Sequence, residues 1–422
     1  MKEDFLHHIW KYKLFNHHEL LTDEGESIEI LHPGHHNMDS GPDFFNAKIK
    51  INEILWAGNV EIHINSSDWK NHGHQADKAY ENVILHVIYE GDFEAITHGK
   101  KIPVLRLKGK IPDELKARYA ALLNNPEKIP CARQIREIED FYFDTWLERM
   151  AVERLKSKTD RIQLIYQNNE KQSDQTFYEL LARNFGFNIN AEPMQMLANR
   201  TPVKLLAKHK QSLFQTEAIL LGQAGFLDTD FEDEYPRKLK AEYEFLKHKY
   251  AFTSLHKSVW KFSKTRPNNF PTIRIAQLAA FLCKSSFLIS KIIESKSVGE
   301  IKSHLLAEPH SYWDTHFYPD KPSRKTSKKL SSDAVNNIII NTVSTFLFFV
   351  GEQKNNEELK EKAIDFLKET ESEKNKFTRI WEDLGKHPKD ASQSQAMIHL
   401  TKSYCNLKKC LSCSIGTKIL KS

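Results

Sequence analysis

Two carboxylates and a histidine are spaced so that neighbouring β-strands would bring them together. Asp43 opens an alternating segment, residues 44–51, while Glu61 and His63 occupy alternate positions of the next one, residues 56–64. Alternation places Glu61 and His63 on one face, and antiparallel pairing across so short a connection would bring Asp43 beside Glu61. Carboxylates held this close repel each other unless a cation lies between them. The pattern predicts a site for Mg²⁺ or Mn²⁺, which would bring water able to attack a phosphodiester.

Histidines concentrate in the same region and allow a different metal site. His63, His72 and His74, with Asp77, offer the imidazole and carboxylate ligands that suit zinc or manganese. This set would make the protein a histidine-based metallohydrolase acting on a small molecule. The alternative is that these histidines are scattered surface or core residues, because no compact motif of the H-E-x-x-H kind is present.

The cysteines near the end of the chain form the most specific spacing in the sequence. Cys405, Cys410 and Cys413 make a C-x4-C-x2-C pattern, which suggests that their thiolates bind zinc or an iron–sulfur cluster. A fourth ligand is needed, and Cys131 would supply it if the C-terminal segment folded back. The alternative is three small apolar side chains in a terminal helix. Cys283 lies in an apolar helical segment and is interpreted as a core residue.

A basic segment with interleaved aromatic residues lies between residues 261 and 274. It contains Lys261, Lys264, Arg266 and Arg274 beside Phe262 and Phe270. Such a segment could follow a phosphate backbone and stack on bases, which would make nucleic acid a partner. The alternative is a loop that enters a helix, with Arg274 paired locally.

The strand pattern resembles the PD-(D/E)XK nuclease superfamily, in which Pro-Asp is followed on the next strand by an acid, any residue and a lysine. Here the pattern is Pro42-Asp43 and then Glu61-Ile62-His63, so histidine replaces lysine. The resemblance implies that Asp43 and Glu61 hold the metal. It also implies that His63 takes the place of the group that orients water and steadies charge in the transition state. A nuclease-like fold that binds nucleic acid without cutting it is the other function that the resemblance allows. In some nucleases of this superfamily a metal cluster bound by cysteines also holds the fold together.

The whole chain is also similar to a bacterial family of unknown function, the domain-of-unknown-function family numbered 2851. The phrases that carry this resemblance run from end to end: GPDFFNAKI, GNVEIH, SSDWKNHGH, NVILHV, IPCARQI, GQAGFL, RPNNFPTIRIAQLA and CNLKKCLSCSIG. The family brings no established activity, so a function has to be argued from the residues.

Composition favours a folded protein of the reducing cytoplasm. The 61 basic and 56 acidic residues give a net charge of +5, which permits a nucleic-acid partner without requiring one. Five cysteines in a chain of 422 residues do not suggest a disulfide framework. We expect no membrane span, because the most apolar stretch, residues 334–350, is interrupted by Asn336, Asn337, Asn341 and Thr342.

The order of the elements predicts an α+β protein. A helix over residues 3–15 precedes strands over 27–31, 44–51 and 56–64, a helix within 68–82, and strands over 83–89 and 102–107. Counting in twos places Asp43 on the face of Phe45, Ala47, Ile49 and Ile51 unless a bulge intervenes. Helical periodicity dominates after about residue 111. We therefore predict a small nuclease-like α/β domain over residues 1–110 and a large helical domain over residues 111–422, with the cysteine cluster at its end.

Overall fold

The structure is a computed structural model that describes residues 2–284 and 288–422. Its mixed sheet, followed by many helices, confirms the α+β class. The chain divides into two compact units, which are described separately. The first comprises Met1–Trp146 together with Thr401–Ser422, and the second comprises Leu147–Leu400.

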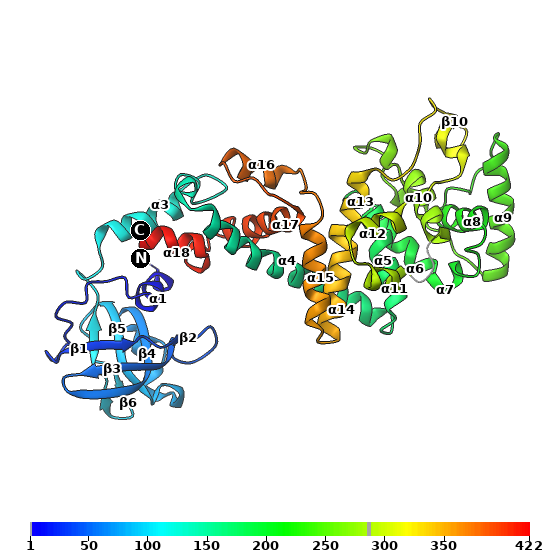
Figure 1. Ribbon diagram of the computed structural model, residues 1–422. Coiled ribbons are helices and arrows are strands. Elements are labelled where there is room, and N and C mark those ends of the chain that lie inside the picture. The colour runs from blue at the N-terminus through cyan, green and yellow to red at the C-terminus, as the bar shows by residue number, and fades with distance from the viewer. Residues whose placement is uncertain (1, 285–287) are drawn as a thin grey trace. The chain divides into compact units, whose positions relative to one another are not determined.

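This division differs from the boundary predicted near residue 110 because the end of the chain belongs to the first unit. The Arg118 guanidinium donates a hydrogen bond to the Leu420 carbonyl, with an N···O distance of 3.3 Å. The Tyr142 hydroxyl lies 3.0 Å from the Ser414 carbonyl oxygen. The Lys421 ammonium lies over the Tyr12 ring, so the two ends of the chain meet within this unit (Figure 1). The cysteine-bearing segment is therefore not part of the large helical unit.

The first unit is built around a mixed β-sheet (Figure 1). Its strands follow the order β1-β3-β4-β5-β8, with β2 paired to β3. β1, β3 and β4 pair antiparallel, whereas β5 lies parallel to both β4 and β8. The bounds are β1 (Ile28–His32), β2 (His35–His36), β3 (Phe44–Ile51), β4 (Ile54–Asn65), β5 (Val83–Glu90) and β8 (Val104–Arg106). The central strands β4 and β5 therefore carry residues 61–63 and 83–90 into the middle of the sheet.

A β-bulge in β3 changes which side chains reach the buried face. The register with β4 shifts between Phe44 and Ala47, and Asn46 adopts a left-handed φ of 57°. As a result, Phe44 rather than Phe45 is buried together with Ala47 and Ile49. The face predicted by counting in twos was wrong for Phe45, because the extra residue of a bulge reverses the alternation.

Helices and short elements complete the first unit. α1 ends earlier than the predicted residue 15, because Lys13 takes a left-handed φ of 52°. The helices are α1 (Glu3–Lys11), α2 (Asp68–Asn71), α3 (Asp113–Asn124), the start of α4 (Asp140–Asn168) and α18 (Ser414–Lys421). The short elements are the 3₁₀ turns His74–Ala76, Lys78–Tyr80, Ile135–Glu137 and Cys410–Ser412 and the hairpin of β6 (Ile96–Thr97) and β7 (Lys100–Lys101).

The second unit is helical apart from one small hairpin, β9 (His316–Tyr318) and β10 (Lys321–Pro322), within its described residues. Its helices continue from α4 through α5 (Ser173–Phe185), α6 (Ala191–Arg200), α7 (Val203–Leu206), α8 (Leu213–Gln223), α9 (Glu234–Tyr250), α10 (Pro271–Lys284), α11 (Leu288–Glu294), α12 (Val298–Leu305), α13 (Ser332–Ile338), α14 (Ser344–Gln353), α15 (Glu357–Lys368), α16 (Lys376–Asp383) and α17 (Ala391–His399). Among the described residues, Ser332–Gln353 forms the one helical stretch long and apolar enough to cross a membrane, and 89% of its apolar window is buried inside the protein.

The contact between α8 and α9 depends on a glycine and gives a test of the core of the second unit. A Cβ atom at Gly222 would lie 2.1 Å from the Tyr243 ring. We expect Gly222→Ala to lower the free energy of unfolding by about 1 to 3 kcal/mol, because overpacking outweighs the helix propensity gained. Chemical denaturation measures this change. In the control Gly299→Ala the new Cβ would meet only the Ser297 hydroxyl, at 3.6 Å. A Gly222→Ala protein as stable as this control would contradict the packing.

Candidate metal centre

Pairing of β3 with β4 brings Asp43 and Glu61 together, as the spacing predicts. The Asp43 amide donates to Glu61 Oε2 over 3.1 Å, and the Ile62 amide donates to Asp43 Oδ2 over 2.9 Å. Each carboxylate is thus held by the backbone of the neighbouring strand. Glu61 is only 5% exposed, so water reaches this pair from a restricted direction.

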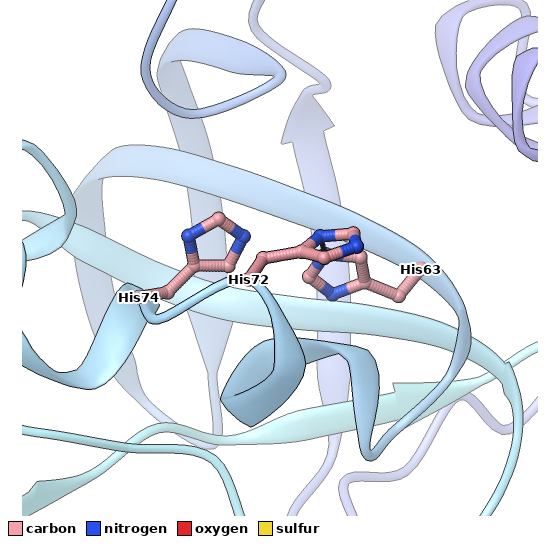
Figure 2. A group of neighbouring side chains, drawn as sticks. All are labelled: His63, His72 and His74. Atoms are coloured by element: carbon pink, nitrogen blue, oxygen red, sulfur yellow. Dashed lines mark hydrogen bonds between the residues drawn. The ribbon is translucent and has the colours of Figure 1, made fainter.

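Three imidazoles, those of His63, His72 and His74, gather in one place (Figure 2). The ligand atoms of His63, His72 and His74 all lie within 4.8 Å of one another. His63 Nε2 is 3.2 Å from His72 Nδ1. Glu61 Oε1 is 3.2 Å from His74 Nε2 and 3.5 Å from His63 Nε2. We call these four side chains, Glu61, His63, His72 and His74, the histidine cluster.

The turn after β4 places His72 and His74 over the sheet. α2 ends at Asn71, and Gly73 then adopts a left-handed φ of 79°, from which a 3₁₀ turn starts at His74. Glycine is favoured in this conformation because it has no Cβ. His74 becomes buried while His72 stays exposed. The histidine cluster therefore has one side open to solvent, at His72.

A second layer of side chains fixes the rings of the cluster. His86 on β5 stands in register with Glu61, and its Nε2 lies 2.9 Å from His63 Nδ1. The Tyr80 ring stacks on His74 at a centroid distance of 3.9 Å, and Trp69 packs edge-on against His74 and at a tilt against His86. Side chains that hold the second nitrogen of an imidazole orient it as a metal ligand and raise its basicity.

Asp43 also faces an imidazole from α1. His7 Nε2 lies 3.2 Å from Asp43 Oδ2. Burial lowers the pKa of His7, but the hydrogen bond and charge of Asp43, with help from Glu3, outweigh burial, so the pKa is raised overall. A histidine paired with a carboxylate in this way can take up a proton during a reaction.

Burial shifts the pKa values of Glu61, His63 and His86. It raises the pKa of Glu61 to about 7, with an opposing contribution from His74 and a further rise from Asp43. Burial also lowers the pKa of His63 to about 2 and that of His86 to about 3, and the neighbouring imidazoles add to both shifts. These two rings are therefore neutral near pH 7. Neutral imidazole is the form that binds metals, whereas it lacks the charge of the lysine that His63 replaces in the nuclease pattern.

The spacing of the histidine cluster fits a transition metal. Zn–N bonds of about 2.0 to 2.1 Å in a tetrahedron separate neighbouring ligand atoms by about 3.4 Å. The His63–His72, Glu61–His74 and Glu61–His63 separations, 3.2, 3.2 and 3.5 Å, are close to this value, and the ligand atoms of the three imidazoles all lie within 4.8 Å of one another. Three imidazoles with one carboxylate suit zinc, manganese or iron better than Mg²⁺, which prefers oxygen ligands and retains its waters.

Two of the predicted sites lie elsewhere or are arranged differently. Asp77 does not join the histidine cluster, because it is exposed and its carboxylate accepts a hydrogen bond from the Ala79 amide. In the basic segment Lys261, Lys264 and Arg266 are exposed, whereas Arg274 is only 5% exposed.

Arg274 is removed from the surface by local contacts. Its guanidinium donates to Gln277 and Asn269, over 2.8 and 2.5 Å, and lies over the Phe187 ring. It faces a cavity of about 1010 Å³ that Arg266 also lines. The local pairing proposed as the alternative for Arg274 is therefore correct, and Arg274 cannot extend an exposed phosphate-binding stripe.

Two residues of the site were missed by reading the sequence. His7 lies on the predicted first helix, but nothing in helical periodicity points it toward Asp43. His86 interrupts the apolar run Val83–Tyr89, and a polar residue inside a central strand is a usable signal. Its partner could not be named, because the parallel register of β4 and β5 is set by a long crossover.

Comparisons with known proteins give a family and no activity. No curated protein and no solved structure matches the chain. The family model described as a protein of unknown function, DUF2851, matches residues 3–376 and includes both strands and all the histidines of the site. With most of its length matched, the chain belongs to the DUF2851 family.

Proposed function

We propose that the first unit is a metal-dependent phosphodiesterase that cleaves nucleic acid, with DNA as the expected substrate. The observation that carries this proposal is the convergence of Asp43, Glu61 and three imidazoles from two adjacent strands and the turn that follows them. Burying carboxylates and several imidazoles lowers the stability of a fold, so such a group is typical of a site that binds a ligand or catalyses a reaction. The free thiols and the mild positive charge are consistent with a cytoplasmic protein that meets nucleic acid.

The residues divide into two roles under this proposal. The histidine cluster would hold the metal, preferably Mn²⁺ or Zn²⁺ because imidazoles outnumber carboxylates. When bound there, the ion would lower the pKa of water and polarise a phosphoryl oxygen. Asp43 would hold His7, whose imidazole would take up the proton released when water attacks phosphorus. His72, the exposed member, marks the side from which substrate would approach.

The element order supports a phosphodiester substrate over other hydrolysable groups. A helix, a strand, the strand opened by Asp43, the strand with Glu61, a helical connection and a parallel strand follow one another. This is the order that the resemblance to PD-(D/E)XK nucleases requires. Cleavage of labelled polynucleotides tests the assignment to nucleic acid, because a fold alone does not determine a substrate.

A second candidate is a module that binds nucleic acid without cutting it. His63 stands where those nucleases have lysine, and its ring is already engaged by His72, His86 and Glu61. A ring held on several sides cannot reorient to assist the attacking water. Both the nuclease and the binding module would bind nucleic acid, and only the nuclease would cleave it.

The assay uses the full chain with labelled single-stranded DNA, double-stranded DNA and RNA. Each nucleic acid is incubated with the protein and Mg²⁺, Mn²⁺ or Zn²⁺, and cleavage is measured on denaturing gels. Binding of the same nucleic acids is measured separately, without metal. We expect cleavage of DNA with Mn²⁺ or Zn²⁺ exceeding that with Mg²⁺. Binding without cleavage under any metal would select the second candidate. Hydrolysis of a small phosphate ester with no action on polynucleotides would select a histidine-based metallohydrolase.

His86 offers a test of the second layer that leaves every proposed ligand in place. We expect His86→Ala to weaken metal binding by about 10-fold to 100-fold, because His63 loses the partner of its Nδ1 atom. Calorimetric titration of the metal-free protein with Mn²⁺ or Zn²⁺ measures the change in affinity. His98→Ala, at an exposed histidine on the β6–β7 turn, is the matched control. Equal affinities for the two variants would exclude a role for His86.

A further inference from the structure

The cavity of about 1010 Å³ that Arg266 and Arg274 line lies wholly within the second unit. Most of its wall is formed by the start of α10 and the turn before it, the loop after β10, the start of α13 and the segment between α15 and α16. Five of its lining residues are Lys or Arg, and three are Asp or Glu. Pockets for small molecules usually have volumes of about 300 to 1,000 Å³. The cavity is therefore large enough for a ligand, and its wall carries more basic than acidic groups.

Arg274, on the first turn of α10, is a buried cation whose charge no acid balances. Among residues 2–284 and 288–422, its guanidinium forms no ion pair with a carboxylate, and its two hydrogen bonds go to the neutral amides of Asn269 and Gln277. A guanidinium has five N–H donors, and the buried Nε atom of Arg274 has no acceptor within the described chain. Burying a charged donor without an acceptor lowers stability. The amides thus fix the plane of the guanidinium and leave its charge available to an anion.

Lys328 brings a second buried cation to the same wall. It is 3% exposed, and its ammonium lies 3.0 Å from the Thr326 carbonyl oxygen and 2.5 Å from the hydroxyl of that residue. Its third contact, at 3.5 Å, is also a backbone carbonyl, and the Phe317 ring lies 4.0 Å away. The Gln277 side-chain nitrogen donates to the Lys328 carbonyl over 2.8 Å while its oxygen accepts from Arg274. One glutamine therefore connects the two cations.

Burial works against the charge of both cations. It lowers the pKa of Arg274 to about 10 and also lowers the pKa of Lys328, with Asp314 opposing the second shift. Arg274 therefore remains charged near pH 7. An anion bound beside the two groups would favour their charged forms, so binding would recover part of the free energy lost to burial.

Acceptors in the wall indicate that the ligand also carries hydrogen-bond donors. Asn336 of α13 is 6% exposed, and its Oδ1 atom is buried without a donor in the part of the chain that the structure describes. Its nitrogen donates to Glu371 over 3.3 Å, and Glu373 accepts from Gln395. These two acids of the wall are thus held by amides and not by the buried cations. A ligand hydroxyl would supply the donor that Asn336 lacks.

We infer that this cavity binds a small phosphate ester, with its phosphoryl group at Arg274 and Lys328 and its hydroxyl groups beside Asn336. A phosphate monoester carries a charge of about −1.5 to −2 near pH 7, which matches two buried cations. The planar guanidinium presents parallel N–H donors that suit phosphate oxygens. Nucleotides and sugar phosphates share this chemistry. The site has no residue in common with the histidine cluster and does not depend on the proposed nuclease activity.

Calorimetric titration of the full chain in EDTA and a phosphate-free buffer tests the inference. The compounds are adenosine monophosphate, ribose phosphate, inorganic phosphate and adenosine. We expect a phosphate ester to bind more tightly than inorganic phosphate, and adenosine to bind at least about 10-fold more weakly than adenosine monophosphate, because a charged hydrogen bond contributes more than a neutral one. The comparison of adenosine monophosphate with ribose phosphate separates a nucleotide site from a sugar phosphate site.

Three variants locate the binding. Arg274→Gln should weaken binding of the preferred ester by about 10-fold to 100-fold, because it removes the charged fork. Arg266→Gln, at an exposed position of the wall, should weaken it by about 2-fold to 5-fold. Arg200→Gln is the matched control, because Arg200 is exposed, lies outside the cavity wall and donates to the carbonyls of Thr253 and Ser254.

Several results would overturn the inference, and two of them require no variant. One is failure of the unaltered chain to bind either ester, and the other is adenosine binding as tightly as adenosine monophosphate. Equal affinities of Arg274→Gln, Arg266→Gln and Arg200→Gln would also exclude the site. Binding of a phosphorylated DNA oligonucleotide without binding of either ester would assign the cavity to the end of a nucleic acid instead. Because EDTA removes divalent metals, failure of the nuclease assay would not alter these outcomes.

Discussion

Glu61→Gln is expected to lower the rate of phosphodiester cleavage by about 10³-fold and to release most of the bound Mn²⁺ or Zn²⁺. Glu61 is the one carboxylate of the histidine cluster and lies 3.2 Å from His74, so an amide there removes the acidic group and an anionic ligand. Losses of about 10²-fold to 10³-fold follow removal of a single electrostatic contact in an active site. Single-turnover cleavage and elemental analysis of the same preparation measure the two effects.

The neighbouring acids supply the comparison. Asp77→Asn alters an exposed carboxylate outside the cluster and should leave both readouts unchanged. Asp43→Asn should reduce cleavage while most of the metal is retained, because Asp43 contacts His7 and the Ile62 amide rather than the imidazoles of the histidine cluster. If Glu61→Gln and Asp77→Asn cleave equally well, Glu61 has no part in the reaction.

The stability of the second unit should fall as the pH rises from 5 to 8 because of Glu217. This residue of α8 is fully buried and accepts hydrogen bonds from Tyr235, over 2.5 Å, and from Trp313, over 3.4 Å. Burial raises its pKa from 4.5 to about 7, although Tyr235, Trp313 and the backbone at His310 oppose the rise. The folded protein thus binds a proton more tightly than the unfolded chain. Its stabilisation is complete below pH 4.5 and is lost as the pH approaches and passes 7.

The expected loss between pH 5 and pH 8 is about 2 to 3 kcal/mol, since one pKa unit corresponds to about 1.4 kcal/mol. Glu217→Gln keeps the shape of the protonated acid and should remove this part of the pH dependence. Urea unfolding of both proteins across the range gives the difference directly, so that other titrating groups cancel. Glu361→Gln makes the same change at an exposed position of α15. Parallel pH profiles for wild type and Glu217→Gln would contradict the prediction.

Local sequence patterns predicted the parts of the site that depend on one strand or one turn. Alternation placed Glu61 and His63 on one face, and the short connection between β3 and β4 placed Asp43 beside Glu61. The proximity of His72 and His74 followed from their spacing around Gly73. These relations are set by backbone geometry over a few residues, which is why a sequence can reveal them.

Relations between distant segments could not be predicted in the same way. The bulge at Asn46 depends on how β3 pairs, and the place of His86 depends on a parallel register set by a crossover. The docking of residues 401–422 likewise depends on α3 and α4, so the boundary near residue 110 did not match the two units. Only the cysteines indicated this docking, because a metal site built on Cys405, Cys410 and Cys413 would need a fourth ligand from elsewhere in the chain.

The helical geometry of the apolar stretch over residues 334–350 is also interrupted for a non-local reason. It contains a π-helical segment, Ile339–Val343, between α13 and α14. The Asn184 amide of α5 donates to the Asn337 carbonyl and to the Thr342 hydroxyl, over 3.1 and 3.0 Å. A side chain inserted into the backbone ladder favours such a bulge. Periodicity within the helix itself contains no sign of Asn184.

The closure of the first unit by residues 401–422 has a consequence for how the protein is made. Residues 1–146 emerge from the ribosome first, the second unit emerges next, and residues 401–422 emerge last. Nascent domains usually fold in the order of their synthesis. Here the second unit is complete first, and the earliest part of the polypeptide must wait for the latest. A premature stop codon at residue 401 would spare the second unit and remove the contacts that α18 makes with Arg118 of α3 and with the Tyr12 ring.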